Sequence, residues 1–220
     1  GYINRTELKR MIFGIQRTIN TSEVTILLKE DITTDSLANL FINKGVLHNK
    51  KHFLSQLEKL NLFNETVDAG KYVILSGTKL SALAMSFARN SDGHGSGESK
   101  VKIVFNRCKS IEDIGMNVSK CIQADSASLV NYISSPKTLN KYGFTIQQMP
   151  ALFLPDEYEM YFDTDAETFV AKMAEEFKLF WNDERKEKMK LIGLTSPSQV
   201  STLASIVYSE QGKIASEWPI

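Results

Sequence analysis

The spacing of hydrophobic residues in the first third of the chain alternates between the period of a strand and that of a helix. Residues 24–28 are rich in β-branched side chains and predict a strand, as do residues 71–75. Between them, Thr34 can cap a helix that ends at Gly45, and Asn49 can cap a second helix with leucine and phenylalanine on one face. The pattern therefore predicts a strand–helix–helix–strand unit.

The middle of the chain contains one clear interruption. Residues 90–99 read Asn-Ser-Asp-Gly-His-Gly-Ser-Gly-Glu-Ser, without an apolar side chain. Such a segment predicts an exposed loop. Because it lacks the lysine and the spacing of a phosphate-binding loop, we interpret it as a connector. We expect a helix before it (78–89), a strand after it (101–105), and two helical stretches within 110–133.

The last third of the chain has the period of helices. Apolar side chains recur at steps of three and four residues from Ala166 to Trp181, which predicts a helix with an aromatic core face. A final helix has the strongest start signal in the chain, with Ser196 as N-cap, Pro197 at the first helical position and Gln199 at the third. Its apolar stripe comprises Val200, Leu203, Ala204 and Val207.

Glu210 lies at the edge of this apolar stripe. At about 100° per residue it falls about 20° from Leu203, and Gly212 can end the helix just after it. A carboxyl group on the buried side of a last helical turn resists ionisation, because burial removes water and the helix C-terminus carries partial negative charge. Such a group suits a general acid. The alternative is a glutamate whose head group reaches solvent.

Composition and charge narrow the class of protein. The chain has 220 residues, of which 42% are hydrophobic, enough for a substantial core. Its 26 basic and 26 acidic residues balance, which argues against nucleic acid as the main partner. No apolar run reaches the roughly 18 residues of a membrane span, and no secretory signal opens the chain. We therefore expect any membrane anchor to lie outside this sequence.

Residues that commonly bind metals or cofactors form no recognisable motif. His48 and His52 have helical spacing but lack the glutamate of a metalloprotease motif, and His94 stands in the glycine-rich loop. Cys108 and Cys121 have no neighbouring ligands and are interpreted as small core residues. We expect neither a metal nor a cofactor.

Three segments, in the same order and spacing, match recurring motifs of one known family. Residues 204–211, Ala-Ser-Ile-Val-Tyr-Ser-Glu-Gln, are similar to the motif Ala-Ser-Ile-(Val/Ile)-x-x-Glu-Thr. Residues 154–158, Leu-Pro-Asp-Glu-Tyr, are similar to Phe-Pro-Asp-Thr-Tyr, although the acidic residues there favour a turn when taken alone. The strand–helix–helix–strand pattern of 24–75 looks like a LysM-like module. The chain thus resembles the YceG-like family of MltG-type endolytic murein transglycosylases.

The resemblance implies an α+β fold in four parts. An N-terminal extension (1–23) precedes the LysM-like module (24–76), which is followed by a linking α/β part (77–150). Residues 151–220 would form the mainly helical start of the catalytic domain. Family members continue well beyond this point, so we expect the fragment to be inactive alone.

The implied enzyme is a lytic transglycosylase that cuts nascent peptidoglycan strands internally. The family's catalytic glutamate corresponds to Glu210, the residue that the helix pattern selects independently. Glu210 would protonate the glycosidic oxygen between N-acetylmuramic acid and N-acetylglucosamine, and then accept the proton of the C6 hydroxyl as a 1,6-anhydro ring closes. Asp156 and Tyr158 are the candidate substrate contacts.

The implied location is the outer face of the bacterial inner membrane, with one N-terminal anchor. Glycan strands would be the substrate, and a peptidoglycan synthase a possible partner. Glu157 and Gln211 stand where the family usually has threonine, and these departures motivate an alternative hypothesis: a non-catalytic glycan-binding or scaffolding protein. An older family label, aminodeoxychorismate lyase, requires pyridoxal phosphate on a lysine, for which the sequence has no motif.

Overall fold

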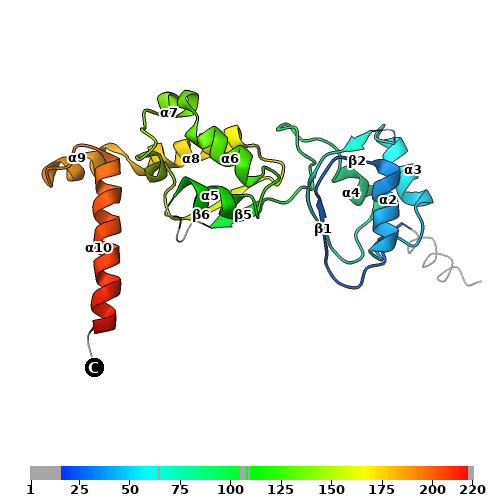
Figure 1. Ribbon diagram of the computed structural model, residues 1–220. Coiled ribbons are helices and arrows are strands. Elements are labelled where there is room, and N and C mark those ends of the chain that lie inside the picture. The colour runs from blue at the N-terminus through cyan, green and yellow to red at the C-terminus, as the bar shows by residue number, and fades with distance from the viewer. Residues whose placement is uncertain (1–15, 64, 105–107, 109, 218–220) are drawn as a thin grey trace, which may run out of the picture. The chain divides into compact units, whose positions relative to one another are not determined.

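The computed structural model describes residues 16–217 except 64, 105–107 and 109 (Figure 1). The chain forms two compact units. Unit 1 comprises the described residues up to Lys102 together with Glu159–Asp163, and unit 2 comprises Ile103–Tyr158 and the described residues from Thr164 onwards. Helices and small two-stranded sheets make up the described chain, which confirms the α+β class. The domain boundaries expected from the sequence remain predictions.

The framework of unit 1 is an antiparallel pair of strands with two helices between them in sequence. In this pair, β1 (Val24–Leu28) lies beside β4 (Gly70–Ile74), so that Leu28 faces Gly70. The connecting helices are α2 (Thr34–Asn43) and α3 (Lys51–Lys59), which confirms the strand–helix–helix–strand prediction. Two shorter strands, β2 (Ile32–Thr33) and β3 (Thr66–Val67), pair antiparallel at the ends of the helices.

An aromatic cluster fills the core of unit 1. The Phe41 and Phe53 rings meet edge to face at 5.3 Å between centroids, and Phe87 packs on both. Tyr72, from β4, adds its ring to Phe87 at 4.7 Å. Because burial of one such side chain stabilises a fold by about 1.5–3 kcal/mol, the cluster is a main source of the stability of unit 1.

The helix starts in unit 1 differ in detail from the sequence prediction. Thr33, not Thr34, caps α2, and its hydroxyl accepts the Ser36 backbone N–H at 3.2 Å. The Thr34 hydroxyl, which is buried, instead donates to the Phe63 carbonyl. α3 begins at Lys51, and the Asn49 side-chain oxygen accepts the Lys51 backbone N–H at 3.2 Å, although Asn49 stands one residue before the N-cap position. Local sequence offered two adjacent threonines, and only the fold decided between them.

The glycine-rich loop 90–99 is a packed element and not a simple exposed connector. It follows α4 (Leu80–Met85), a helix shorter than the predicted 78–89. The Gly97 amide donates to the Ser86 carbonyl at 2.8 Å, and the Ser99 amide donates to the Lys71 carbonyl at 2.7 Å. These bonds hold the second half of the loop against α4 and β4, since Gly95 and the Glu98 side chain are buried.

Unit 2 is mainly helical. Its helices are α5 (Ile111–Val118), α6 (Ser126–Ser134), α7 (Pro136–Tyr142), α8 (Ala166–Phe180), α9 (Asp183–Leu191) and α10 (Pro197–Glu217), with a 3-10 turn, η1 (Met149–Leu152). α5 packs on α6, and α6 packs on α8. Helices within 110–133 and over the Ala166 to Trp181 stripe are therefore confirmed, with Phe169, Val170 and Met173 buried.

A third pair of strands contains the boundaries between the two units. β5 (Val101–Val104) pairs with β6 (Glu157–Met160), and the boundaries along the chain fall within these two strands, after Lys102 and after Tyr158. Cys108 and Cys121 are half-buried rather than core residues, and the Asn117 side-chain amide donates to the Cys108 Sγ at 3.1 Å. Among the described helices, none has the length and apolar content to cross a membrane.

Candidate functional site

Helix α10 carries Glu210, and its start is the predicted capping box. The Ser196 hydroxyl accepts the Gln199 backbone N–H at 3.4 Å, and the Gln199 side-chain oxygen accepts the Ser196 backbone N–H at 3.3 Å. The same Gln199 oxygen accepts the Thr195 backbone N–H at 2.7 Å. These bonds satisfy amide groups that have no partner within the helix. The predicted start of the helix is confirmed.

The predicted end of this helix is wrong. α10 continues through Gly212 to Glu217, so Glu210 lies in the helix interior rather than in its last turn. A glycine in a helix interior costs about 1 kcal/mol relative to alanine, and its neighbours Gln211 and Lys213 are good helix formers. The helix dipole acts mainly within the terminal turn. It therefore contributes little at Glu210.

The face of α10 that the sequence predicts to be buried is exposed in the described part of the chain. Leu203 is 46% exposed and Val207 47% exposed, and Glu210 beside them is exposed as well. α10 contacts α9 and η1. Glu210 is thus presented on an open helix surface with apolar side chains around it, and not in a closed pocket.

Tyr158, a predicted substrate contact, is a buried residue of β6. Its side chain is 7% exposed, and its hydroxyl donates to the Leu154 carbonyl at 2.9 Å. Burial, helped by the negative charge of Asp156, raises the pKa of Tyr158 to about 12. The expected turn at this point is a strand from Glu157 onwards, because the alternating apolar residues Tyr158 and Met160 point into the core.

Asp156, the other predicted substrate contact, is exposed just before β6. Its carboxylate accepts the Glu157 backbone N–H at 2.8 Å. Glu210, Asp156 and Tyr158 all belong to unit 2, and η1, which α10 contacts, lies just before the 154–158 segment. The described structure leaves Glu210 and Asp156 exposed and Tyr158 buried.

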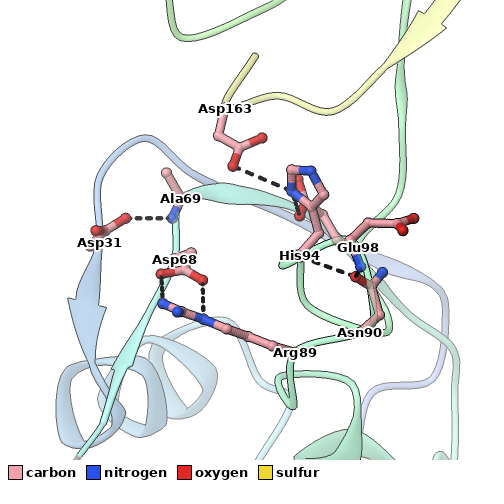
Figure 2. Close-up of polar contacts among 9 residues, drawn as sticks. Asp31, Asp68, Ala69, Arg89, Asn90, His94, Glu98 and Asp163 are labelled. Atoms are coloured by element: carbon pink, nitrogen blue, oxygen red, sulfur yellow. Dashed lines mark hydrogen bonds and ion pairs between the residues drawn. The ribbon is translucent and has the colours of Figure 1, made fainter. Parts of the chain in front are cut away.

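A second polar cluster, which the sequence reasoning missed, lies in unit 1 (Figure 2). The Nδ1 atom of His94 is 3.4 Å from a carboxylate oxygen of Glu98 and 3.4 Å from one of Asp163. His94 and Glu98 come from the glycine-rich loop, whereas Asp163 follows β6. The His94 ring stacks on Tyr161 with 3.8 Å between centroids, which fixes the plane of the imidazole.

The electrostatic environment of this cluster is negative. Burial, reinforced by the charge of Asp163, raises the pKa of Glu98 to about 7, while the Phe162 backbone amide acts in the opposite direction. Burial also raises the pKa of Asp163, against the attraction of His94. Nearby, Arg89 neutralises Asp68 through two hydrogen bonds of 3.0 and 2.8 Å (Figure 2).

The sequence predicted no metal site, but the cluster contains three candidate metal ligands. Among the described residues, the ligand atoms of His94, Glu98 and Asp163 all lie within 4.8 Å of one another. The spacing of His94 and Glu98 was visible in the sequence. The position of Asp163 was not, because this residue joins them only when the chain returns to unit 1 within β6.

Comparison with known proteins defines the class. The described chain is an α+β protein with a βααβ framework in one unit and a long capped helix in the other. The sequence model of the YceG-like family matches residues 26–219, and the chain belongs to this family.

One solved structure among those similar to the chain is a yceG-like protein from Listeria monocytogenes. The alignment has 13% sequence identity and a TM-score of 0.39, and it covers 80% of this chain and 60% of that one. The chain therefore spans 60% of the length of that protein. No curated protein matches the chain.

Proposed function

We propose that the protein is a peptidoglycan lytic transglycosylase in which Glu210 serves as general acid and then as general base. The observation that carries the proposal is the position of Glu210: its segment resembles the family motif Ala-Ser-Ile-Val-x-x-Glu, and it lies on an exposed face of a capped helix. Family membership supports the reaction class, and the capped helix holds the carboxyl group on a regular backbone.

The reaction needs only one protein carboxyl group. Hydrolytic glycosidases use a second carboxylate as nucleophile or to activate water. In a lytic transglycosylase the C6 hydroxyl of the N-acetylmuramic acid ring is the nucleophile. Glu210 gives its proton to the glycosidic oxygen as that bond breaks. It then takes the proton of the C6 hydroxyl as the C6 oxygen bonds to C1, so the carboxyl group ends the cycle protonated again.

Substrate binding would complete the environment that Glu210 needs. A general acid near neutral pH requires a carboxyl group that resists ionisation, and loss of water has that effect. Glu210 is exposed beside Leu203 and Val207. A sugar ring lying across this apolar face would remove water from the carboxyl group while leaving the glycosidic oxygen within its reach.

Substrate, partner and location follow from the same proposal. The LysM-like module would hold the glycan strand, and Asp156, which is exposed, could contact it. Tyr158 would act indirectly, since its buried hydroxyl holds the Leu154 carbonyl. The protein would work at the outer face of the bacterial inner membrane, beside a peptidoglycan synthase.

Digestion of purified peptidoglycan by the full-length protein tests the proposal. We expect 1,6-anhydro-muropeptides from the wild-type protein and none from Glu210→Gln, which keeps the shape of the side chain and removes its acid. Glu184→Gln is the matched control, because Glu184 is an exposed helical glutamate of α9 whose carboxylate pairs with Lys188 at 2.6 Å. Unchanged cleavage by Glu210→Gln would contradict the proposal.

The exposure of Glu210 also bears on the alternative, a glycan-binding or scaffolding protein. Glu210 is exposed in the described chain, so the proposed acid role depends on a sugar that covers the carboxyl group. Release of 1,6-anhydro product distinguishes the two functions. A folded wild-type protein that binds glycan strands but releases no anhydro product, however long the incubation, would establish the binding function instead.

A further inference from the structure

We propose that His94, Glu98 and Asp163 form a binding site for a zinc ion in unit 1. The site is independent of the proposed glycan chemistry, since its three ligands lie outside the unit that carries Glu210. The zinc ion would connect the glycine-rich loop to the segment Glu159–Asp163.

The distances fit a tetrahedral ion. Zinc binds nitrogen and carboxylate oxygen at about 2.0–2.2 Å, so two ligands on one tetrahedral ion lie about 3.3–3.6 Å apart. His94 Nδ1 is 3.4 Å from an oxygen of Glu98 and 3.4 Å from one of Asp163. All three ligand atoms lie within 4.8 Å of one another, so a small movement of one side chain closes the third edge.

Buried, unpartnered oxygens are the independent sign of a ligand. The Glu98 side chain is 1% exposed, and neither carboxylate oxygen has a hydrogen bond of ordinary geometry within the described residues, although His94 Nδ1 lies 3.4 Å away and the Phe162 backbone amide faces the carboxylate. The Asp163 Oδ1 atom is also buried without a hydrogen-bond partner. A buried carboxylate is costly unless it is paired or coordinates a cation. One histidine faces both carboxylates, and a divalent ion would neutralise them.

The surrounding charges favour a cation at this position. Arg89 is already occupied by the two oxygens of Asp68, and the Lys100 Nζ atom lies over the Tyr161 ring at 5.4 Å from its centroid. The carboxylate of Asp31 accepts the Ala69 backbone N–H at 2.8 Å and adds negative charge nearby (Figure 2). The cluster therefore lies in a negative field that its own histidine does not cancel.

The kind of ligands selects the kind of ion. Magnesium and calcium prefer sites made of oxygen, whereas imidazole nitrogen favours zinc and related transition metals. A set of one nitrogen and two carboxylates is suited to zinc with a water molecule at the fourth position. The Tyr161 ring, stacked on His94, would hold the imidazole in the orientation that points Nδ1 at the ion.

Zinc titration of the full chain, after removal of metals with a chelator, tests the site. We expect one zinc ion bound per chain by calorimetry and a thermal midpoint that rises with zinc concentration. Glu98→Gln and Asp163→Asn keep the side-chain shapes and should each lose saturable binding. His52→Gln is the matched control, because His52 is an exposed histidine of α3 in the same unit.

Several outcomes would overturn the assignment. No saturable zinc binding by the wild-type chain would do so without any variant, which keeps the test decisive even if a variant misfolds. Equal affinities of wild-type and Asp163→Asn chains would place the ion elsewhere. Tighter binding of magnesium than of zinc would contradict a nitrogen ligand. Cobalt in place of zinc should give visible absorption bands that Glu98→Gln removes.

Discussion

The carboxyl group of Glu98 lies directly against the backbone of Gly70. A Cβ atom at position 70 would meet both the Cδ and an oxygen of Glu98 at 2.8 Å, closer than real Cβ contacts. The Glu98 side chain is buried and has no solvent to retreat into. Gly70 therefore determines where this carboxylate sits, because only a residue without a side chain leaves room for it.

Gly70→Ala should weaken the proposed zinc site without changing a ligand. The added methyl group displaces Glu98, and we expect zinc affinity to fall by at least about tenfold. Overpacking should also cost about 1–3 kcal/mol of unfolding free energy, measured with urea. Gly45→Ala is the control: its φ of +66° makes the substitution strained, but nothing lies within 4 Å of the new methyl. Equal zinc affinity in Gly70→Ala and wild type would contradict this account.

Ser196→Ala should loosen the start of α10. The variant loses the hydroxyl that accepts the Gln199 backbone N–H, and such caps are worth about 1 kcal/mol. We expect faster hydrogen exchange of the backbone amides in the first turn of α10. If Glu210 acts as proposed, the rate of glycan cleavage by the full-length protein should also fall. Ser198→Ala, two residues on, serves as the comparison, since Ser198 accepts the Thr202 hydroxyl at 2.9 Å through its backbone carbonyl, which the substitution keeps.

Tyr158→Phe should reduce the loss of unfolding free energy that the chain shows as the pH rises from 10 to about 12. The pKa of Tyr158 is raised from its ordinary value of 10.0 to about 12, so the folded state disfavours ionisation of this residue. Its stabilising contribution is complete below pH 10 and is lost as the pH rises towards 12. The advantage of the wild type over Tyr158→Phe in urea unfolding should therefore shrink over that range. Parallel pH profiles for the two proteins would disprove it.

Phe41→Ala should destabilise unit 1 severely. Phe41 is fully buried between Phe53 and Phe87, and truncation of a buried phenylalanine costs about 3–5 kcal/mol. Phe63→Ala, at a residue that is 42% exposed, should cost much less. Urea unfolding measures both. Similar losses in the two variants would mean that the aromatic cluster is not the main source of stability.

Much of the secondary structure followed from local pattern. The strand at Val24–Leu28 and the capping box at Ser196 depend on residues adjacent in sequence, so spacing alone predicts them. The end of α10 did not follow, because Gly212 permits a helix to end without forcing it to. Whether a permissive residue is used depends on contacts and on the stability of the helix on either side.

The same distinction between local pattern and tertiary packing applies to the candidate site at Glu210. Glu210 could be selected from the sequence, since helix geometry and a family motif both refer to neighbouring residues. Its exposure could not, because burial depends on what else packs against α10. The stripe of Leu203 and Val207 has the spacing of a core face, yet it is open in the described chain.

The sequence by itself determined the α+β class, the order of the principal elements, the family and the glutamate of its motif. Only the tertiary structure decided that Tyr158 is buried, that the loop 90–99 is packed, and that Asp163 meets His94 and Glu98. The physical reason is the separation along the sequence of the residues that interact. Helices, strands and caps depend on hydrogen bonds and side chains a few residues apart. The zinc ligands depend on loop and strand segments that approach one another only when unit 1 has closed around its core.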